Sequence, residues 1–236
     1  MCNGSIMDKL ISFSLPLMVS GILQLAFNAV DIIVVGRFSG SQALAAVGST
    51  TALINVFTNL FIGISLGANV LAARFYAAGK DREMSETVHT SITLALISGI
   101  MMAVIGVLLA KWALEIMGTP DDVIGQSALY MRIYFMGMPF FMLYNYGAAI
   151  LRAIGDTKRP LIFLIISGIA NAALNMILVI LFHMGVAGVA IGTIISQLIS
   201  CVLVLTCLYR SEGSYQLRFS KLKINGAYME QIFQVG

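Results

Sequence analysis

Long apolar stretches without a charged side chain dominate the chain. They cover 10–30, 38–73, 87–110, 133–151 and 161–209. A helix needs about 20 mostly apolar residues to cross a bilayer, so the last stretch is long enough for two crossings. We therefore predict an all-α fold, an integral-membrane six-helix bundle. Its spans are expected at 10–35, 44–73, 86–110, 123–150, 161–182 and 187–209.

Short polar segments between these spans predict turns. Residues 118–122 read Gly-Thr-Pro-Asp-Asp, a break followed by a carboxylate that suits a helix N-terminus. Pro160 closes another polar segment and suits the first turn of the next helix. The remaining turns are expected at 36–41, 77–83 and 183–188. The predicted parts are a cytoplasmic lead-in at 1–9, a six-helix lobe at 10–209, and a cytoplasmic linker at 210–236.

Composition narrows the class of protein. The chain is 59% hydrophobic and 11% charged, whereas a soluble domain carries about 25% charged residues. This excludes a water-soluble enzyme and a disordered tail, and no nucleophile-and-base constellation is present. The three cysteines, Cys2, Cys201 and Cys207, are expected to be free thiols. We expect no metal site, no nucleic-acid partner and no enzymatic activity.

The basic residues indicate how the bundle is oriented. Two of them, Arg37 and Lys111, fall at one set of turns, and Arg132 falls inside the fourth span. Eleven fall at the other side: Lys9, Arg74, Lys80, Arg82, Arg152, Lys158, Arg159, Arg210, Arg218, Lys221 and Lys223. Lys and Arg are enriched in cytoplasmic loops. We therefore predict a multi-pass plasma-membrane protein with both termini in the cytoplasm.

The two ends of the chain resemble each other. Residues 7–14, before the first span, and residues 229–236, at the end, are both short amphipathic lead-ins. One interpretation is a tail that lies on the membrane surface. The other is that 229–236 begins a second six-helix repeat, because transporters often contain such repeats. The missing half, or a second copy of the chain, would then be a partner.

Asp31 is the one carboxylate well inside an apolar stretch. Gln24, Asn28 and Asp31 are spaced at i, i+4 and i+7, so they share one helix face. Pro16, nearer the start of this span, can kink the helix. Polar groups at this depth are costly and mark pathways or contacts. A carboxylate away from water binds a proton more readily, and it can also bind Na⁺ together with amide and hydroxyl oxygens. The alternative is an interfacial Asp that caps the Gly36 turn.

Three more spans carry polar stripes at helical spacing. They are Thr51, Asn55, Thr58 and Asn59 in the second span, Ser167, Asn171 and Asn175 in the fifth, and Thr193, Gln197 and Ser200 in the sixth. A single stripe is usually a packing seam between helices. Four stripes around one acid favour a shared, water-filled cavity. The aromatic and Met-rich segment 130–146, which includes Tyr144, suits a cavity for varied apolar cations. Arg132 is expected to snorkel or to pair with a carboxylate.

Several motifs together resemble the multidrug and toxic compound extrusion (MATE) transporters. They are Leu15-Pro16, the run from Gln24 to Asp31 followed by Val35-Gly36, and Ala43 to Gly48. Further motifs are Leu151 to Pro160, Asn175 to Leu178, and Gly185 to Thr193. The resemblance covers all six spans. It implies one lobe, the N-terminal one, of a twelve-helix, two-lobe exporter that expels drugs and organic cations in exchange for H⁺ or Na⁺, without another cofactor.

The resemblance also implies roles for particular residues. The coupling ion would bind at Asp31, Asn175 and Thr193, with Asn171 and Asn145 as weaker carry-overs. The polar stripes and the aromatic segment, apart from the resemblance, add Asn28 beside Asp31 and a substrate cavity lined by Gln24, Asn55, Asn59, Tyr144 and Gln197. Many relatives carry an Asp where this chain has Val179, which leaves Asp31 as the lone acid. Two alternatives remain: a related lipid-linked oligosaccharide flippase, whose cavity should be basic, and a non-transporting membrane scaffold.

Overall fold

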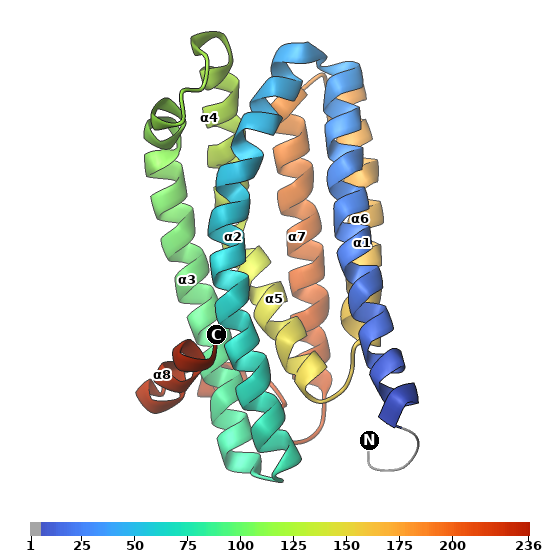
Figure 1. The fold of residues 1–236 in the computed structure, drawn as a ribbon, viewed down its shortest axis with the longest axis vertical. Helices are drawn as coiled ribbons and strands as arrows, with labels where there is room; N and C mark the ends of the chain where they lie inside the picture. Colours follow the sequence, from blue (N-terminus) through green and yellow to red (C-terminus); the bar gives the residue numbers. More distant parts are fainter. Residues whose placement is uncertain (1–5) are drawn as a thin grey trace.

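A computed structural model describes residues 6–236, which form a bundle of long helices (Figure 1). The helices are α1 (Ile6–Phe38), α2 (Gly40–Ala77), α3 (Asp81–Ile116), α4 (Asp121–Met136), α5 (Met138–Ala153), α6 (Lys158–Met176), α7 (Gly185–Arg210) and α8 (Gly226–Val235). A π-helical turn, η1 (Ile177–Leu181), extends α6, and a 3₁₀ turn, η2 (Phe219–Lys221), precedes α8. The all-α prediction is confirmed.

Six crossings are present, although the fourth is divided. In residues 6–236, five helices are long and apolar enough to span a membrane: α1, α2, α3, α6 with η1, and α7. The sixth crossing consists of α4 and α5, which follow each other along the bundle axis (Figure 1). The span predicted at 123–150 is therefore present, but it consists of two helices that meet at Gly137. Pro139 has no N–H, and its ring crowds the carbonyl of Phe135, so the helix is interrupted at Gly137.

The helices extend past the predicted apolar spans because their polar ends are also helical. Residues 6–9 of the predicted lead-in form the first turn of α1, and Pro160 lies in the first turn of α6 as expected. Only Ser39 separates α1 from α2, and Gly40 permits this sharp turn with φ of 88°. Cys201 and Cys207 are free, as predicted, whereas Cys2 lies outside the described residues.

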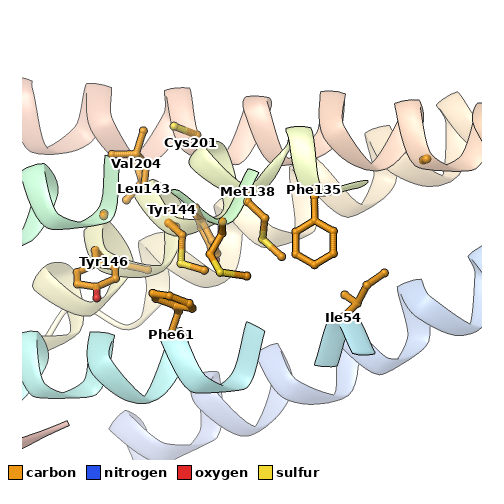
Figure 2. Close-up of a cluster of buried hydrophobic side chains, with 14 of the residues drawn as sticks. Ile54, Phe61, Phe135, Met138, Leu143, Tyr144, Tyr146, Cys201 and Val204 are labelled. Carbon is orange, nitrogen blue, oxygen red and sulfur yellow. The ribbon is translucent and has the colours of Figure 1, made fainter. Parts of the chain in front are cut away.

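The core lies where α5 passes between α2, α3 and α7. Figure 2 shows this cluster, with Tyr146 on the Phe61 side and Phe135 opposite Ile54 of α2. Large side chains fit because small residues face them. A Cβ at Gly106 of α3, for example, would overlap the Phe135 ring. This packing holds the divided fourth crossing rigidly beside the polar helix faces.

The chain after α7 folds back along the outside of the bundle. It reaches α8, which packs against α2 and α3 (Figure 1). Ile232 of α8 is fully buried, and its carbonyl lies so close to Gly67 of α2 that a Cβ there would collide with it. Residues 229–236 therefore form a helix that is docked on the lobe.

Candidate functional site

Asp31 lies against α6, and its side chain is only 9% exposed. The amide Nδ2 of Asn175 in α6 donates a hydrogen bond to its Oδ1. This contact joins the first crossing to the fifth across 144 positions of sequence. The carboxylate therefore faces the interior of the lobe and does not cap the Gly36 turn.

A line of hydrogen bonds continues from this carboxylate toward α7. Asn175 Nδ2 also donates to Asn171 Oδ1 at 3.3 Å, and Asn171 Nδ2 donates to Thr193 Oγ1 at 3.4 Å. The Thr193 hydroxyl in turn donates to the carbonyl of Val189 at 2.9 Å. Both amides direct their NH₂ groups along this line, which fixes their orientation. Three helices thus share one polar network that ends on a single acid.

Close packing between α6 and α7 holds Asn175 in place. Asn175 is completely buried, and a Cβ at Gly192 of α7 would overlap its Oδ1. Within residues 6–236 this Oδ1 has no hydrogen-bond partner. A buried amide oxygen without a partner is costly and is typical of sites that bind a ligand or a water molecule. This oxygen is also a ready ligand for a hard cation.

The network borders a cavity of about 240 Å³ between the helices. All four predicted polar stripes contribute to it. The lining residues are Gln24, Phe27, Asn28 and Asp31 from α1; Asn55, Thr58, Asn59 and Ile62 from α2; Tyr130 and Tyr134 from α4; Phe141 and Tyr144 from α5; Leu164, Ser167, Gly168 and Asn171 from α6; and Thr193, Ser196, Gln197 and Ser200 from α7. Asp31 is the one charged side chain in this set.

Nearly all of the predicted site residues come together here. Asp31, Asn28, Asn171 and Thr193 line the cavity, and Asn175 bonds to Asp31. The predicted substrate residues also line it: Gln24, Asn55, Asn59, Tyr144 and Gln197. The hydroxyl of Tyr144 donates to the carbonyl of Pro160 at 3.0 Å, which ties α5 to α6 beside the cavity.

Two candidates do not join the site. The side chain of Asn145 donates to the carbonyl of Phe141, four residues earlier, at 2.8 Å, and it is not part of the cavity lining. The amide of Asn145 is therefore engaged within its own helix, α5, which begins after the break at Gly137. Arg132 is exposed on the outside of α4 and has no salt bridge within residues 6–236. The expected pairing with a carboxylate is thus not formed within the described residues, and the expectation that Arg132 snorkels stays a prediction.

The sequence predicts the aromatic wall of the cavity only in part. Tyr130 and Tyr134 are spaced at i and i+4 on α4, and their ring centroids are 6.1 Å apart. They lie in the aromatic segment 130–146 that the sequence indicated, but no single tyrosine other than Tyr144 was selected. Phe27 and Phe141 add two more rings. Aromatic faces around one carboxylate suit a ligand that is both apolar and positively charged.

A polar cavity with one acid thus lies among helices that are long and apolar enough to span a membrane. The MatE family profile matches residues 16–177. The chain therefore belongs to the MatE family.

Individual relatives agree with this assignment. "Probable multidrug resistance protein YoeA" of Bacillus subtilis is 35% identical over 213 residues, which are 89% of this chain and 46% of the relative. "Multidrug export protein MepA" of Staphylococcus haemolyticus is 28% identical over 238 residues, which are 99% of this chain and 52% of the relative. The chain thus spans about half the length of the curated relatives it matches.

Solved structures confirm the fold. A crystal structure described as MATE in the bent conformation superimposes with a TM-score of 0.91 at 22% identity, over 98% of this chain and 52% of that chain. A structure described as the straight conformation gives a TM-score of 0.89. The six crossings therefore correspond to one half of a MATE transporter.

Proposed function

We propose that the chain forms the N-terminal half of a cation-coupled multidrug efflux antiporter that uses H⁺ or Na⁺ and exports drugs and organic cations. The observation that carries the proposal is the buried Asp31 carboxylate, bonded to Asn175 at the wall of an aromatic, otherwise uncharged cavity. The curated relatives, one named for multidrug resistance and one for multidrug export, support the substrate class.

Exchange of an organic cation for a proton follows because both compete for the Asp31 carboxylate. Charged Asp31 attracts an organic cation in the cavity, and the aromatic rings contribute cation–π contact. A proton that enters from the other side neutralises Asp31, which removes this attraction and releases the cation. Protonation also weakens the hydrogen bond from Asn175, because that bond is strongest to a charged acceptor. Helix α1 is then free to shift against α6, which links ion binding to a change of shape.

Sodium is the alternative coupling ion. A sodium ion needs several oxygen ligands, and four side chains of the network offer them: Asp31, Asn171, Asn175 and Thr193. The free Oδ1 of Asn175 favours this reading. Bound Na⁺ would neutralise the carboxylate as a proton does, so both ions support the same exchange scheme.

The exposed side of the cavity suggests a second wall. Gln24, Asn28, Asn55 and Asn59 are exposed in this lobe, at a depth where hydrocarbon would otherwise meet them. Exposed amides in hydrocarbon are costly. A second lobe or a second copy of the chain, facing this side across a water-filled cavity, removes the cost. Transport between two lobes requires no covalent chemistry from the protein.

Drug efflux by the full-length protein tests the proposal. In everted vesicles, ethidium transport is measured under an imposed H⁺ or Na⁺ gradient. Asp31→Asn keeps the shape of the side chain and imitates the protonated, uncharged form of Asp31. We therefore expect the variant to insert normally and to lose gradient-driven export. Asn145→Ala, which alters an amide outside the cavity, is the matched control and should retain transport. Export by Asp31→Asn at the parent rate, with the same ion dependence, would refute the role of Asp31.

One alternative is disfavoured by the cavity. A flippase for lipid-linked oligosaccharides should present basic residues to its anionic substrate, whereas the lining from residues 6–236 contains one acid and no Lys or Arg.

A non-transporting scaffold has no need for a buried acid in a polar network. Absence of any ethidium flux in the full-length protein, under either gradient, would favour the scaffold.

A further inference from the structure

The segment that follows α7 combines exposed positive charge with exposed apolar surface. We call residues 209–224 the basic strap. Its four bases, Arg210, Arg218, Lys221 and Lys223, are all exposed, and none of them forms a salt bridge within residues 6–236. Glu212 is the one acid in the strap. The strap therefore carries a net positive charge, and its bases form no ion pair with a carboxylate of the described residues.

Apolar side chains alternate with these bases. Residues 218–224 read Arg-Phe-Ser-Lys-Leu-Lys-Ile, and Phe219 and Ile224 are 55% and 40% exposed. Tyr209, at the end of α7, stacks on Phe219 with ring centroids 5.7 Å apart. Exposed aromatic rings beside long basic side chains are typical of the interface between membrane and water, where each part of the side chain finds its preferred solvent.

The strap is a fixed part of the fold. Leu217 is fully buried, and its N–H donates to the carbonyl of Leu208 at 3.0 Å. The backbone N–H of Arg218 donates to His89 Nε2 of α3 at 3.1 Å. Further along, Asn225 donates from its side chain to Glu86 at 2.8 Å and from its backbone to Thr90 at 3.3 Å. The bases are therefore presented on an ordered surface.

The position of the strap matches the level of the lipid headgroups. It begins where the apolar stretch 161–209 ends, so its first residues leave the membrane there. Its Arg218 contacts His89 of α3, and the next residue after the strap, Asn225, contacts Glu86 and Thr90, which lie about 8–14 Å along the helix from Asp81. The α2–α3 turn projects beyond this point. The strap runs from the end of α7 to α8, which packs against α2 and α3 (Figure 1).

A hollow of about 690 Å³ lies between the strap and α3. Lys221, Lys223 and the hydroxyl of Ser220 face it from the strap. Glu86 also lines it, but both carboxylate oxygens of Glu86 are engaged, by Arg82 at 3.2 Å and by Asn225. Asp81 is the other acid in the lining, and it opposes two lysines. The hollow is therefore roomy and, on its strap side, basic.

We propose that the basic strap binds the headgroups of anionic phospholipids. The phosphate groups would pair with Arg218, Lys221 and Lys223, while Phe219 and Ile224 enter the upper acyl region. Basic segments next to a transmembrane helix gain affinity for anionic lipids with each Lys or Arg near the surface. This surface is separate from the Asp31 cavity, so the inference does not depend on the proposed transport function.

Photo-crosslinking tests the lipid contact directly. The full-length protein carries p-benzoylphenylalanine in place of Phe219 and is reconstituted in vesicles of equal parts phosphatidylglycerol and phosphatidylcholine. After irradiation, mass spectrometry gives the ratio of the two lipid adducts. We expect phosphatidylglycerol adducts to dominate. In the R218Q/K221Q/K223Q variant the ratio should fall by roughly fivefold for each base removed, until it reaches the bulk composition.

A matched control separates local from general charge effects. Lys111→Gln removes an exposed base near the opposite end of α3, away from the strap, and it should leave the ratio unchanged. If the triple variant does not fold, Lys221→Gln and Lys223→Gln are measured singly, and each should lower the ratio. A parent ratio equal to the bulk composition overturns the proposal. Adducts with polypeptide alone, or no adduct, also overturn it, because the strap would then face protein or water.

Discussion

Asn175 in α6 donates a hydrogen bond to Asp31 in α1, and this contact links the first and fifth crossings of the lobe. The same amide nitrogen also donates to Asn171, so the orientation of Asn175 is fixed from two sides. Asp31 is thereby held at the cavity wall by a neutral partner, not by a base. A neutral partner leaves the charge of the carboxylate available to an incoming cation.

Asn175→Ala should impair transport without preventing insertion. The change removes the donor to Asp31, and a hydrogen bond to a charged group contributes about 1.5–3 kcal/mol. We expect gradient-driven ethidium efflux by the full-length protein to fall roughly tenfold or more. Asn145→Ala deletes an amide of the same size that bonds only within its own helix, and should change efflux little. Equal losses in the two variants would argue that Asn175 acts only through packing.

Gly192→Ala should reproduce part of that defect from the opposite helix. A Cβ at position 192 would overlap Asn175 Oδ1, so the amide that bonds to Asp31 must shift from its position. Overpacking of this kind costs about 1–3 kcal/mol. We expect reduced efflux and a lower melting temperature in detergent.

Gly21→Ala in α1 is the control for this substitution, because the structure places nothing within 4 Å of a Cβ at position 21. Alanine favours helix more than glycine does, so this variant should be at least as stable as the parent. A Gly192→Ala protein with parent efflux and parent stability would show that Asn175 tolerates displacement.

Much of this site could be predicted because polar residues are rare in membrane-spanning segments. Asp31, Asn171 and Thr193 stand out in apolar stretches, and their helical spacing places them on interior faces. The resemblance also implied Asn145, but its side chain bonds back to its own helix, and such an amide has the same sequence signature as one that faces a cavity. Tyr130 and Tyr134 escaped selection because tyrosines line cores as often as cavities. The hydrogen bond between Asp31 and Asn175 depends on how α1 packs against α6, which spacing within one helix does not encode.

Reporter fusions test the orientation that the basic residues predict. A reporter that is active only outside the cytoplasm, inserted next to Ser39 in the α1–α2 turn, should give a strong signal. The same reporter at Lys80, in the α2–α3 turn at the opposite end of the bundle, should give none. The physical reason is the retention of Lys and Arg on the cytoplasmic side. The reverse pattern would place both termini outside and would contradict the prediction.

The lobe by itself should not export drugs. Gln24, Asn28, Asn55 and Asn59 line the cavity yet remain exposed, so the lobe supplies one wall of a site that needs two. Alternating access requires two repeats that move against each other around the site. Residues 1–236 expressed alone should therefore leave ethidium accumulation at the level of cells without the gene. A chimera that joins this chain to the second half of the Bacillus subtilis relative should restore efflux, and Asp31→Asn in the chimera should abolish it again. Robust efflux by the purified, monomeric lobe would contradict the requirement for a second wall, whereas efflux by a dimer of the lobe would identify a second copy as that wall.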